Sequence, residues 1–150
     1  MPASKLSLLV VTPEAIIVDE KGIEIVVVKT PVSSSEEDEG KFTETGIMSD
    51  HAPMLARLLV SDVRYKKDQK YYYVAVAGGF LQVKKNVITI SSPGAEKIEA
   101  EAGIDPALVA KRRAEQWLYE ERVGRVGFDE RAAEAEIKKA SVDLYRAKGR

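Results

Sequence analysis

The chain contains no cysteine and only one histidine, His51. Without cysteine it can form no disulfide scaffold, no thiolate metal site and no thiol nucleophile. Zinc sites in proteins are built mainly from cysteine and histidine side chains, so one histidine leaves carboxylates as almost the only donors. We therefore expect no metal site and no cysteine-based catalysis.

Long apolar runs and an excess of charge of one sign are missing too. No segment approaches the roughly 18 apolar residues of a membrane-spanning helix, so we expect no direct membrane insertion. The early apolar run, Leu6–Val11, lacks the cleavage site of a secretory signal, and the lack of a transit peptide favours a bacterial cytoplasmic setting. The 23 basic and 24 acidic residues nearly cancel, which argues against a nucleic-acid partner.

Up to about Ser92 the sequence has the pattern of a β domain. Short runs rich in β-branched residues recur at regular spacing, which is typical of an antiparallel β-sandwich or flattened barrel. Asp19–Gly22 predicts a turn, and Gly78-Gly79 predicts a bend or bulge between two strands. Either alternate set of side chains in Phe80–Lys84 could face the core. The predicted strands are 5–11, 14–18, 23–29, 55–60, 63–65, 71–77, 80–83 and 87–91.

Residues 30–50 interrupt the β pattern. The stretch from Pro31 to Gly40 is polar, acidic and rich in turn-forming residues, which predicts a long exposed loop. Its carboxylate run, Glu36–Glu39, lacks the ligand spacing and the mid-loop glycine of a calcium-binding EF-hand. A solvated loop is the better interpretation.

After residue 94 the apolar period lengthens to between three and four, which predicts helices. Asp105 followed by Pro106 is typical of a helix start, because the carboxylate caps free amides and proline needs no hydrogen bond there. Gly124 and Gly127 interrupt the pattern, which predicts two antiparallel helices joined by a glycine-containing loop.

The expected fold class is therefore α+β, with a β-sandwich domain at 1–92 and a helical hairpin at 93–150. The second predicted helix carries a basic surplus. Basic side chains near a helix C-terminus interact favourably with the helix dipole, which is the simpler explanation. The alternative is a docking surface for an acidic partner. The basic residues are Arg131, Lys138, Lys139, Arg146 and Lys148.

The sequence shows no arrangement typical of an active site. Gly78-Gly79 precedes a predicted strand, whereas a phosphate-binding loop would precede a helix. His51 follows Asp50, but a catalytic triad also needs a positioned nucleophile, and Ser49 points elsewhere in an extended chain. We expect no catalytic residues.

Several motifs occur in a fixed order along the chain. The segments His-Ala-Pro and Gly-Gly-Phe are the most specific of them. Together the motifs resemble the epsilon subunit of F-type ATP synthases, which is called delta in mitochondria, over essentially the whole chain. The motifs are Val10–Glu14, Glu39–Phe42, Gly46–Leu55, Gly78–Val83, Asn86–Ile90 and Ile104-Asp105.

The resemblance implies a non-catalytic rotor subunit. Its sandwich would link the γ subunit to the membrane c-ring, and its hairpin would regulate ATP hydrolysis by the catalytic α and β subunits, with the basic arm meeting an acidic loop of β. Thr12, His51 and Ala56 would face γ. The c-ring-facing residues would be Glu39, Gly40, Lys41 and Phe42, where Lys41 replaces an acidic residue common in the family.

The resemblance also bears on nucleotide binding. In the relatives that bind ATP, an arginine follows the Ile-Asp pair that Ile104 and Asp105 match, and here that position is Leu108. Two further arginines of those relatives fall at Lys139 and Asp143. A phosphate site that loses guanidinium groups and gains a carboxylate binds nucleotide poorly, so we expect weak or absent ATP binding and no cofactor.

Two alternatives stay open at this point. A stand-alone adaptor with a β domain and a helical arm would explain the two-part architecture but not the motifs. An enzyme using carboxylate chemistry has no supporting constellation of residues.

Overall fold

The computed structural model describes residues 5–33, 35–38, 40–100 and 102–125. Within these residues the chain forms an eight-stranded sheet, a short 3-10 helix and one α-helix. The elements are β1 (Leu6–Val11), β2 (Ile16–Ile23), β3 (Ile25–Pro31), η1 (Glu36–Asp38), β4 (Phe42–Met48), β5 (Met54–Lys67), β6 (Lys70–Lys84), β7 (Val87–Ser91), β8 (Ala95–Ile98) and α1 (Pro106–Arg125).

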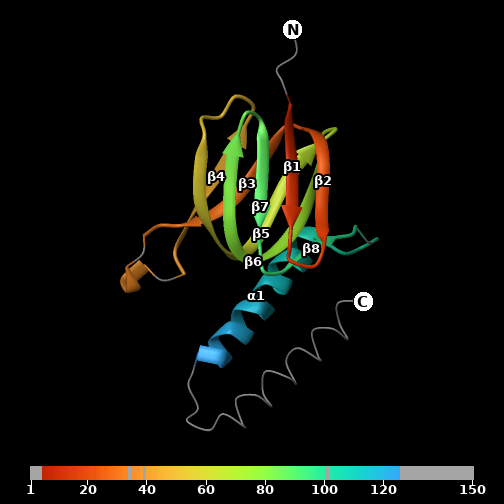
Figure 1. Ribbon diagram of the computed structural model, residues 1–150. Helices are drawn as coiled ribbons and strands as arrows, with labels where there is room; N and C mark the ends of the chain where they lie inside the picture. The colour runs from red at the N-terminus through yellow and green to blue at the C-terminus, as the bar shows by residue number, and fades with distance from the viewer. Residues whose placement is uncertain (1–4, 34, 39, 101, 126–150) are drawn as a thin grey trace. The chain divides into compact units, whose positions relative to one another are not determined.

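The sheet folds over into a sandwich because β5 and β6 are long enough to serve both layers (Figure 1). Residues 54–58 of β5 pair with 79–83 of β6, and this half joins β7, β1 and β2 in layer one. Residues 60–67 of β5 pair with 70–77 of β6, and this half joins β3, β4 and β8 in layer two. The predicted β-sandwich is confirmed.

The corner between the layers lies at Gly78-Gly79. The pairing register of β5 with β6 is the same on both sides of the corner, and the pair of Leu59 with Gly78 is skipped. Ser61 Oγ donates to the freed carbonyl of Leu59 at 2.9 Å. Gly78 and Gly79 have φ of 76° and 114°, values that side chains disfavour. The glycine pair is therefore a bend inside one continuous strand, not a break between two strands as the sequence suggested.

The core lies between the layers and is built from alternate residues of the strands. Leu81 and Val83 point into it, whereas Phe80, Gln82 and Lys84 are exposed, which decides the direction that the alternation left open. The side chains with less than 2% exposure include Tyr65, Leu6, Leu8, Ile23, Ile47, Leu81, Ile88 and Ile90.

Four predictions about the strands are wrong. The turn at Asp19–Gly22 lies inside β2, where the register with β1 shifts and Gly22 takes a φ of 73° at the irregularity. The β pattern is not interrupted throughout residues 30–50, because β4 follows the predicted Pro31–Gly40 loop, and its polar composition concealed this strand. The sandwich also adds β8 after Ser92. Finally, the sheet is mixed rather than antiparallel, because β1 and β7 run parallel.

The predicted helix start is confirmed. Asp105 Oδ1 accepts a hydrogen bond from the amide of Ala107 at 3.0 Å, and α1 begins at Pro106. Gly124, a predicted interruption, lies inside α1. The second helix of the hairpin falls outside the described residues. The chain divides into two compact units, 1–114 and 115–150.

The first turns of α1 belong to the same unit as the sandwich. Ala110 and Ala114 are buried. Arg113 Nε binds a carboxylate oxygen of Glu96 in β8 at 3.0 Å. The ion pair between Arg113 and Glu96 therefore joins this part of α1 to the sandwich.

Candidate interaction surfaces

No metal centre and no membrane-spanning helix are present in the part of the chain that the structure describes. No group of three or more histidine, aspartate or glutamate side chains there is placed to hold a metal ion. The helix that the structure describes has no apolar stretch long enough to cross a bilayer. The candidate sites are therefore surfaces of the sandwich.

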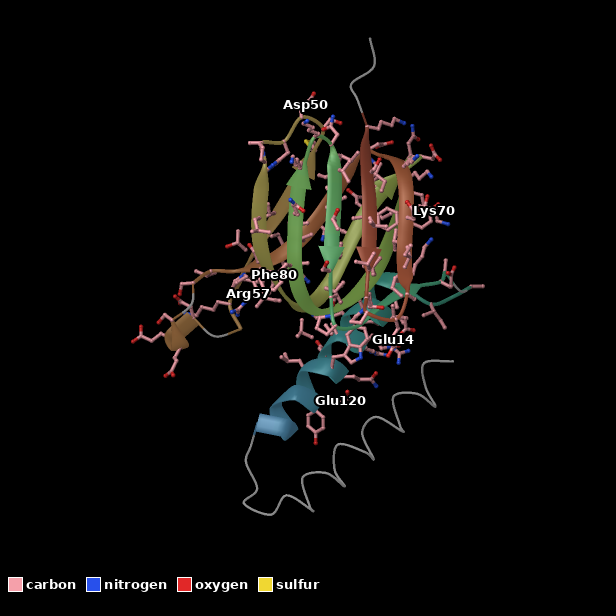
Figure 2. The ribbon with its side chains drawn as sticks, in the orientation of Figure 1. Glu14, Asp50, Arg57, Lys70, Phe80 and Glu120 are labelled. Atoms are coloured by element: carbon pink, nitrogen blue, oxygen red, sulfur yellow. The ribbon has the colours of Figure 1, made fainter. Side chains whose placement is uncertain are left out.

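The outer face of layer one exposes large apolar side chains. Leu55 is 76% exposed, Phe80 59% and Val87 45%. The strand registers align Phe80 with Ser91 of β7 and Arg57 of β5 in one row across the layer, and Figure 2 shows Phe80 close to Arg57. A solvent-exposed phenylalanine on a sheet face signals a contact surface when apolar neighbours accompany it.

The same face also carries apolar side chains on β1, with polar side chains between them and Leu55. The next row across the layer runs from Leu55 through Gln82 and Thr89 to the half-buried Leu9. We call this surface, formed by Leu9, Val11, Leu55, Phe80 and Val87, the apolar face.

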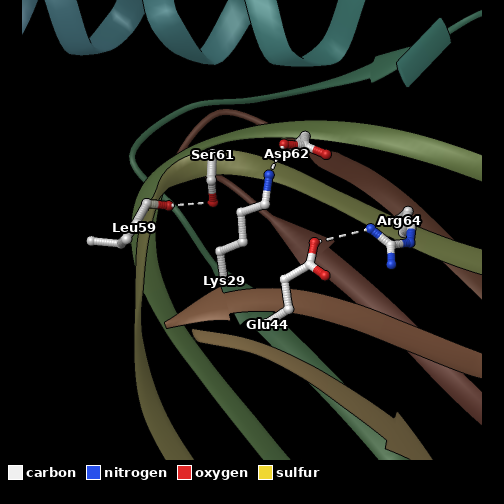
Figure 3. A network of polar contacts seen from close by, with 6 residues as sticks. All are labelled: Lys29, Glu44, Leu59, Ser61, Asp62 and Arg64. Carbon is white, nitrogen blue, oxygen red and sulfur yellow. Dashed lines mark hydrogen bonds and ion pairs between the residues drawn. The ribbon is translucent and has the colours of Figure 1, made fainter. Parts of the chain in front are cut away.

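The outer face of layer two is different, because its charges are paired with one another (Figure 3). Lys29 Nζ lies 2.6 Å from Asp62 Oδ1, and Arg64 Nη1 lies 3.2 Å from Glu44 Oε1. The Lys29 ammonium also lies 5.1 Å from the ring centre of Phe42. This face satisfies its own charges, so the apolar face is the better candidate for docking a partner.

A second ion-pair cluster joins β5 and β8 of layer two to β2 of layer one. Lys67 Nζ of β5 donates to Glu20 Oε2 of β2 at 2.8 Å, and Lys97 Nζ of β8 lies 3.8 Å from Glu20 Oε1. The hydrogen bond from Lys67 lowers the pKa of the Glu20 carboxyl and, in return, raises the pKa of Lys67. This cluster is structural, because its ion pairs join β2, β5 and β8.

Thr12 and His51 lie at opposite ends of layer one. Thr12 follows β1, and its hydroxyl closes the next turn by donating to Ala15 O at 3.2 Å and accepting from Ala15 N at 3.1 Å. His51 follows Asp50, whose amide donates to Asn86 Oδ1 at 2.7 Å in the β6–β7 turn. At roughly 3.3 Å per residue the two ends are about 16 Å apart along β1. The structure therefore does not bring these two residues together.

Ala56 lies between two exposed residues of β5. Its side chain is half-buried and packs against the core, whereas Leu55 and Arg57 point outward. An open depression of about 300 Å³ adjoins Leu55, lined by Pro53–Leu55 and Gln82–Lys84. In this part of β5 the side chains exposed to solvent are therefore those of Leu55 and Arg57.

The hairpin loop at 32–41 carries the residues that the resemblance assigns to the c-ring contact. Lys41 Nζ lies 3.3 Å from Asp38 Oδ1, so its charge is balanced within the loop. Ser33 Oγ donates to Asp38 Oδ2 at 2.6 Å, which closes the loop on itself. Gly40 has a φ of 81°, Phe42 is 50% exposed, and Glu39 lies outside the described residues.

The residues expected near a nucleotide or an acidic partner are only partly described. Asp105 caps α1, and Ile104 is 48% exposed. The basic arm residues Arg131, Lys138, Lys139, Arg146 and Lys148 lie outside the described residues.

Sequence reasoning did not select Leu55, Arg57 or Phe80 as surface residues. The alternation in Phe80–Lys84 could have indicated the exposure of Phe80, because it places this ring on the same face as Gln82 and Lys84. Choosing that polar side as the outer one would have exposed Phe80.

Comparisons with known proteins match this architecture. Residues 5–98 match the family described as "ATP synthase, Delta/Epsilon chain, beta-sandwich domain". The ATP synthase epsilon chain of Symbiobacterium thermophilum is 37% identical over 142 residues, which cover 95% of this chain and 92% of that protein. The ATP synthase epsilon chain of Desulfitobacterium hafniense is 33% identical over 146 residues, which cover 97% and 98%.

The fold comparison agrees. A chain in the structure of the Euglena gracilis mitochondrial ATP synthase with OSCP, F1 and c-ring has a TM-score of 0.53 and 17% identity, covering 97% of this chain and 79% of that one. At that identity the match supports the fold alone. The sequence matches span the β-sandwich and reach into the helical region, and the chain belongs to the ATP synthase delta/epsilon family.

Proposed function

We propose that the chain is a non-catalytic subunit of the central stalk of an F-type ATP synthase, where it joins the γ subunit to the c-ring. The observation that carries this function is the match of more than nine tenths of the chain to ATP synthase epsilon chains. The sandwich contributes two separate surfaces, which suits a subunit that connects two partners. The complex would act at a bacterial membrane, with this subunit peripheral on its cytoplasmic side.

The apolar face is our candidate for the γ contact. It offers exposed apolar side chains from three strands, whereas the outer face of layer two pairs its own charges. Thr12 and His51 mark the two ends of layer one, so a γ surface touching both would span the full length of β1. Leu55 and Phe80 would form the centre of that contact.

The hairpin loop at 32–41 is our candidate for the c-ring contact. Asp38 accepts hydrogen bonds from Ser33 and Lys41 within it, and Phe42 and Val32 are exposed at its base, each to about half of its surface. Because Lys41 is paired with Asp38, the replacement of an acid by Lys41 adds no unbalanced positive charge to this loop.

The C-terminal helical region is our candidate for the regulatory element. A basic arm that includes Arg131, Lys138 and Lys148 would oppose ATP hydrolysis by contacting an acidic loop of the catalytic β subunit. Truncating the chain after Gly103 keeps β8 in the sandwich and removes α1 and everything beyond it. We expect the truncated complex to hydrolyse ATP faster than the intact complex, and unchanged hydrolysis would remove the regulatory part of this proposal.

Binding to γ is the direct test of the stalk role. The double variant Leu55→Ser, Phe80→Ser should weaken binding of the full chain to purified γ by roughly tenfold or more, because two apolar contacts are lost. Tyr71→Ser is the matched control, since Tyr71 is 41% exposed on the other layer. A wild-type chain that does not bind γ in isothermal titration calorimetry would contradict the proposal.

A further inference from the structure

β4 is an open edge of the sheet. It pairs with β3 in an unchanged register from Ile25 with Met48 to Pro31 with Phe42, and it ends the strand order of the described sheet. Its other edge has no strand partner within the described residues. The strand contains no proline, lysine or bulge, which are common protections of such an edge, and Glu44 is its one charged residue.

The backbone groups that face outward can be assigned from one hydrogen bond. The amide of Val32 donates to the carbonyl of Lys41 at 3.2 Å, so this carbonyl faces β3, whereas the amide of Lys41 donates to the carbonyl of Asp38 in the turn. Along an antiparallel strand the amide and carbonyl groups of successive residues point to alternate sides. From Phe42 onward, every second residue of β4 therefore has its backbone groups pointing away from β3. These residues are Phe42, Glu44, Gly46 and Met48.

The other edges of the sheet are less suited to pairing. β2 is irregular, because its register with β1 shifts twice, and it exposes the charged side chains of Asp19 and Lys21. β8 has only four residues. β4 offers seven residues in regular register, with Phe42 exposed to 50% and Met48 to 60%.

We propose that the free chain self-associates by antiparallel pairing of β4 with β4 of a second copy, around a two-fold axis at Thr45. The outward backbone groups then form hydrogen-bonded pairs between the copies. In this register Phe42 lies opposite Met48 of the second copy, which brings an exposed aromatic ring and an exposed thioether together. Glu44 lies opposite Gly46 of the second copy, where no side chain opposes its charge.

Charge and side-chain direction select this register over its neighbours. A shift of two residues one way places Glu44 directly opposite Glu44 of the second copy, and like charges opposite each other are destabilising. A shift of two residues the other way leaves Phe42 without a partner in β4. A shift of one residue would place the exposed side chains on opposite faces.

A proline at position 44 tests the pairing. The amide of Glu44 points away from β3, so Glu44→Pro removes one outward donor from each copy and leaves the β3–β4 hydrogen bonds intact. Glu44→Ala is the matched control, because it also loses the pair with Arg64 but keeps the amide. We expect sedimentation equilibrium to show dimers for the wild type and Glu44→Ala, and about tenfold or more weaker association for Glu44→Pro.

A single cysteine tests the register without relying on the proline variant. The natural chain has no cysteine, so Thr45→Cys would carry the only thiol. Residues opposite each other in a non-hydrogen-bonded pair have Cα atoms about 4.5 Å apart, within the range of a disulfide. Thr43→Cys is the control, because its Cα would lie about 13 Å from its copy in the proposed register.

The outcomes separate clearly. Disulfide-linked dimers of Thr45→Cys, with little linkage of Thr43→Cys, are expected on mild oxidation. A wild-type chain that stays monomeric over its soluble concentration range, or a Glu44→Pro variant that dimerises as strongly as Glu44→Ala, would overturn the proposal. Because γ is absent from these experiments, their failure would leave the stalk role untouched.

Discussion

The carbonyl oxygen of Ser91 lies where a side chain at residue 79 would begin. A Cβ atom placed on Gly79 would stand 2.0 Å from Ser91 O and 2.9 Å from Ser92 Cα. Backbone atoms at the end of β7 therefore fill the space beside the corner of β6. The close approach explains why the corner requires glycine, and the φ of 114° adds a second reason.

Gly79→Ala should therefore lower the free energy of unfolding by about 3 kcal/mol or more, since it adds a backbone clash to an unfavourable φ. Urea denaturation of the full chain measures this loss. Gly40→Ala is the control, because Gly40 also has a positive φ but no atom within 4 Å of the position that a Cβ would take, so we expect a cost of about 1 kcal/mol. Equal costs at the two positions would show that the contact with Ser91 is unimportant.

Glu20→Gln should reduce stability in a pH-dependent way. The Glu20 carboxyl has a pKa lowered below its usual 4.5 by the Lys67 hydrogen bond, so its contribution is complete above pH 4.5 and is lost as the pH falls through the lowered value. The pKa of Lys67 is raised above 10.5 by the same hydrogen bond. The contribution of Lys67 to the free energy of unfolding is therefore present at neutral pH and is lost only as the pH rises through the raised value.

Urea midpoints of wild type and Glu20→Gln should therefore differ at pH 7 and converge in acid. The comparison variant is Glu24→Gln, whose carboxylate lies 3.9 Å from Lys66 and should contribute less. A midpoint difference that grew as the pH fell below 4.5 would contradict the assignment to Glu20.

Tyr65→Phe should leave stability unchanged or raise it by up to about 1 kcal/mol, because the hydroxyl it removes is buried without a hydrogen-bond partner among the described residues. Burial raises the pKa of Tyr65 to about 12, with the charge of Glu20 adding to the shift. Thermal unfolding followed by circular dichroism provides the measurement.

Tyr65→Leu is the contrasting variant. It removes the ring that stacks on Tyr72 at 5.3 Å between centroids, so we expect a loss of about 1 kcal/mol or more. If Tyr65→Phe proved as destabilising as Tyr65→Leu, the hydroxyl would have a partner that the geometry does not reveal.

ATP should bind to the isolated chain weakly or not at all. Leu108 is 46% exposed at the position where ATP-binding relatives carry an arginine, and the Asp105 carboxylate already caps α1. Calorimetric titration of the full chain with ATP tests this, with Leu108→Arg as the variant expected to gain affinity. Sub-millimolar binding by the wild type would contradict the expectation.

Local signals in the sequence were sufficient for α1, because a cap and a proline act on their immediate neighbours. They were insufficient for β4, since Thr43–Thr45 looks like loop while its pairing with β3 supplies the hydrogen bonds that make it a strand. The parallel pairing of β1 with β7 could not be predicted either, because it joins segments about eighty residues apart. The exposure of Phe80 could not be predicted, because the alternation along β6 does not show which of its two faces packs against the core.

The shared strands β5 and β6 also determine how the sandwich responds to force. In a sandwich whose layers touch only through side chains, a lateral load on one layer is resisted by packing alone. Here two continuous strands, β5 and β6, pass from one layer to the other, with Gly78-Gly79 at the corner of β6, and connect the layers covalently. A torque applied at the apolar face would reach layer two through the backbone, so the domain would rotate as one stiff piece rather than shear.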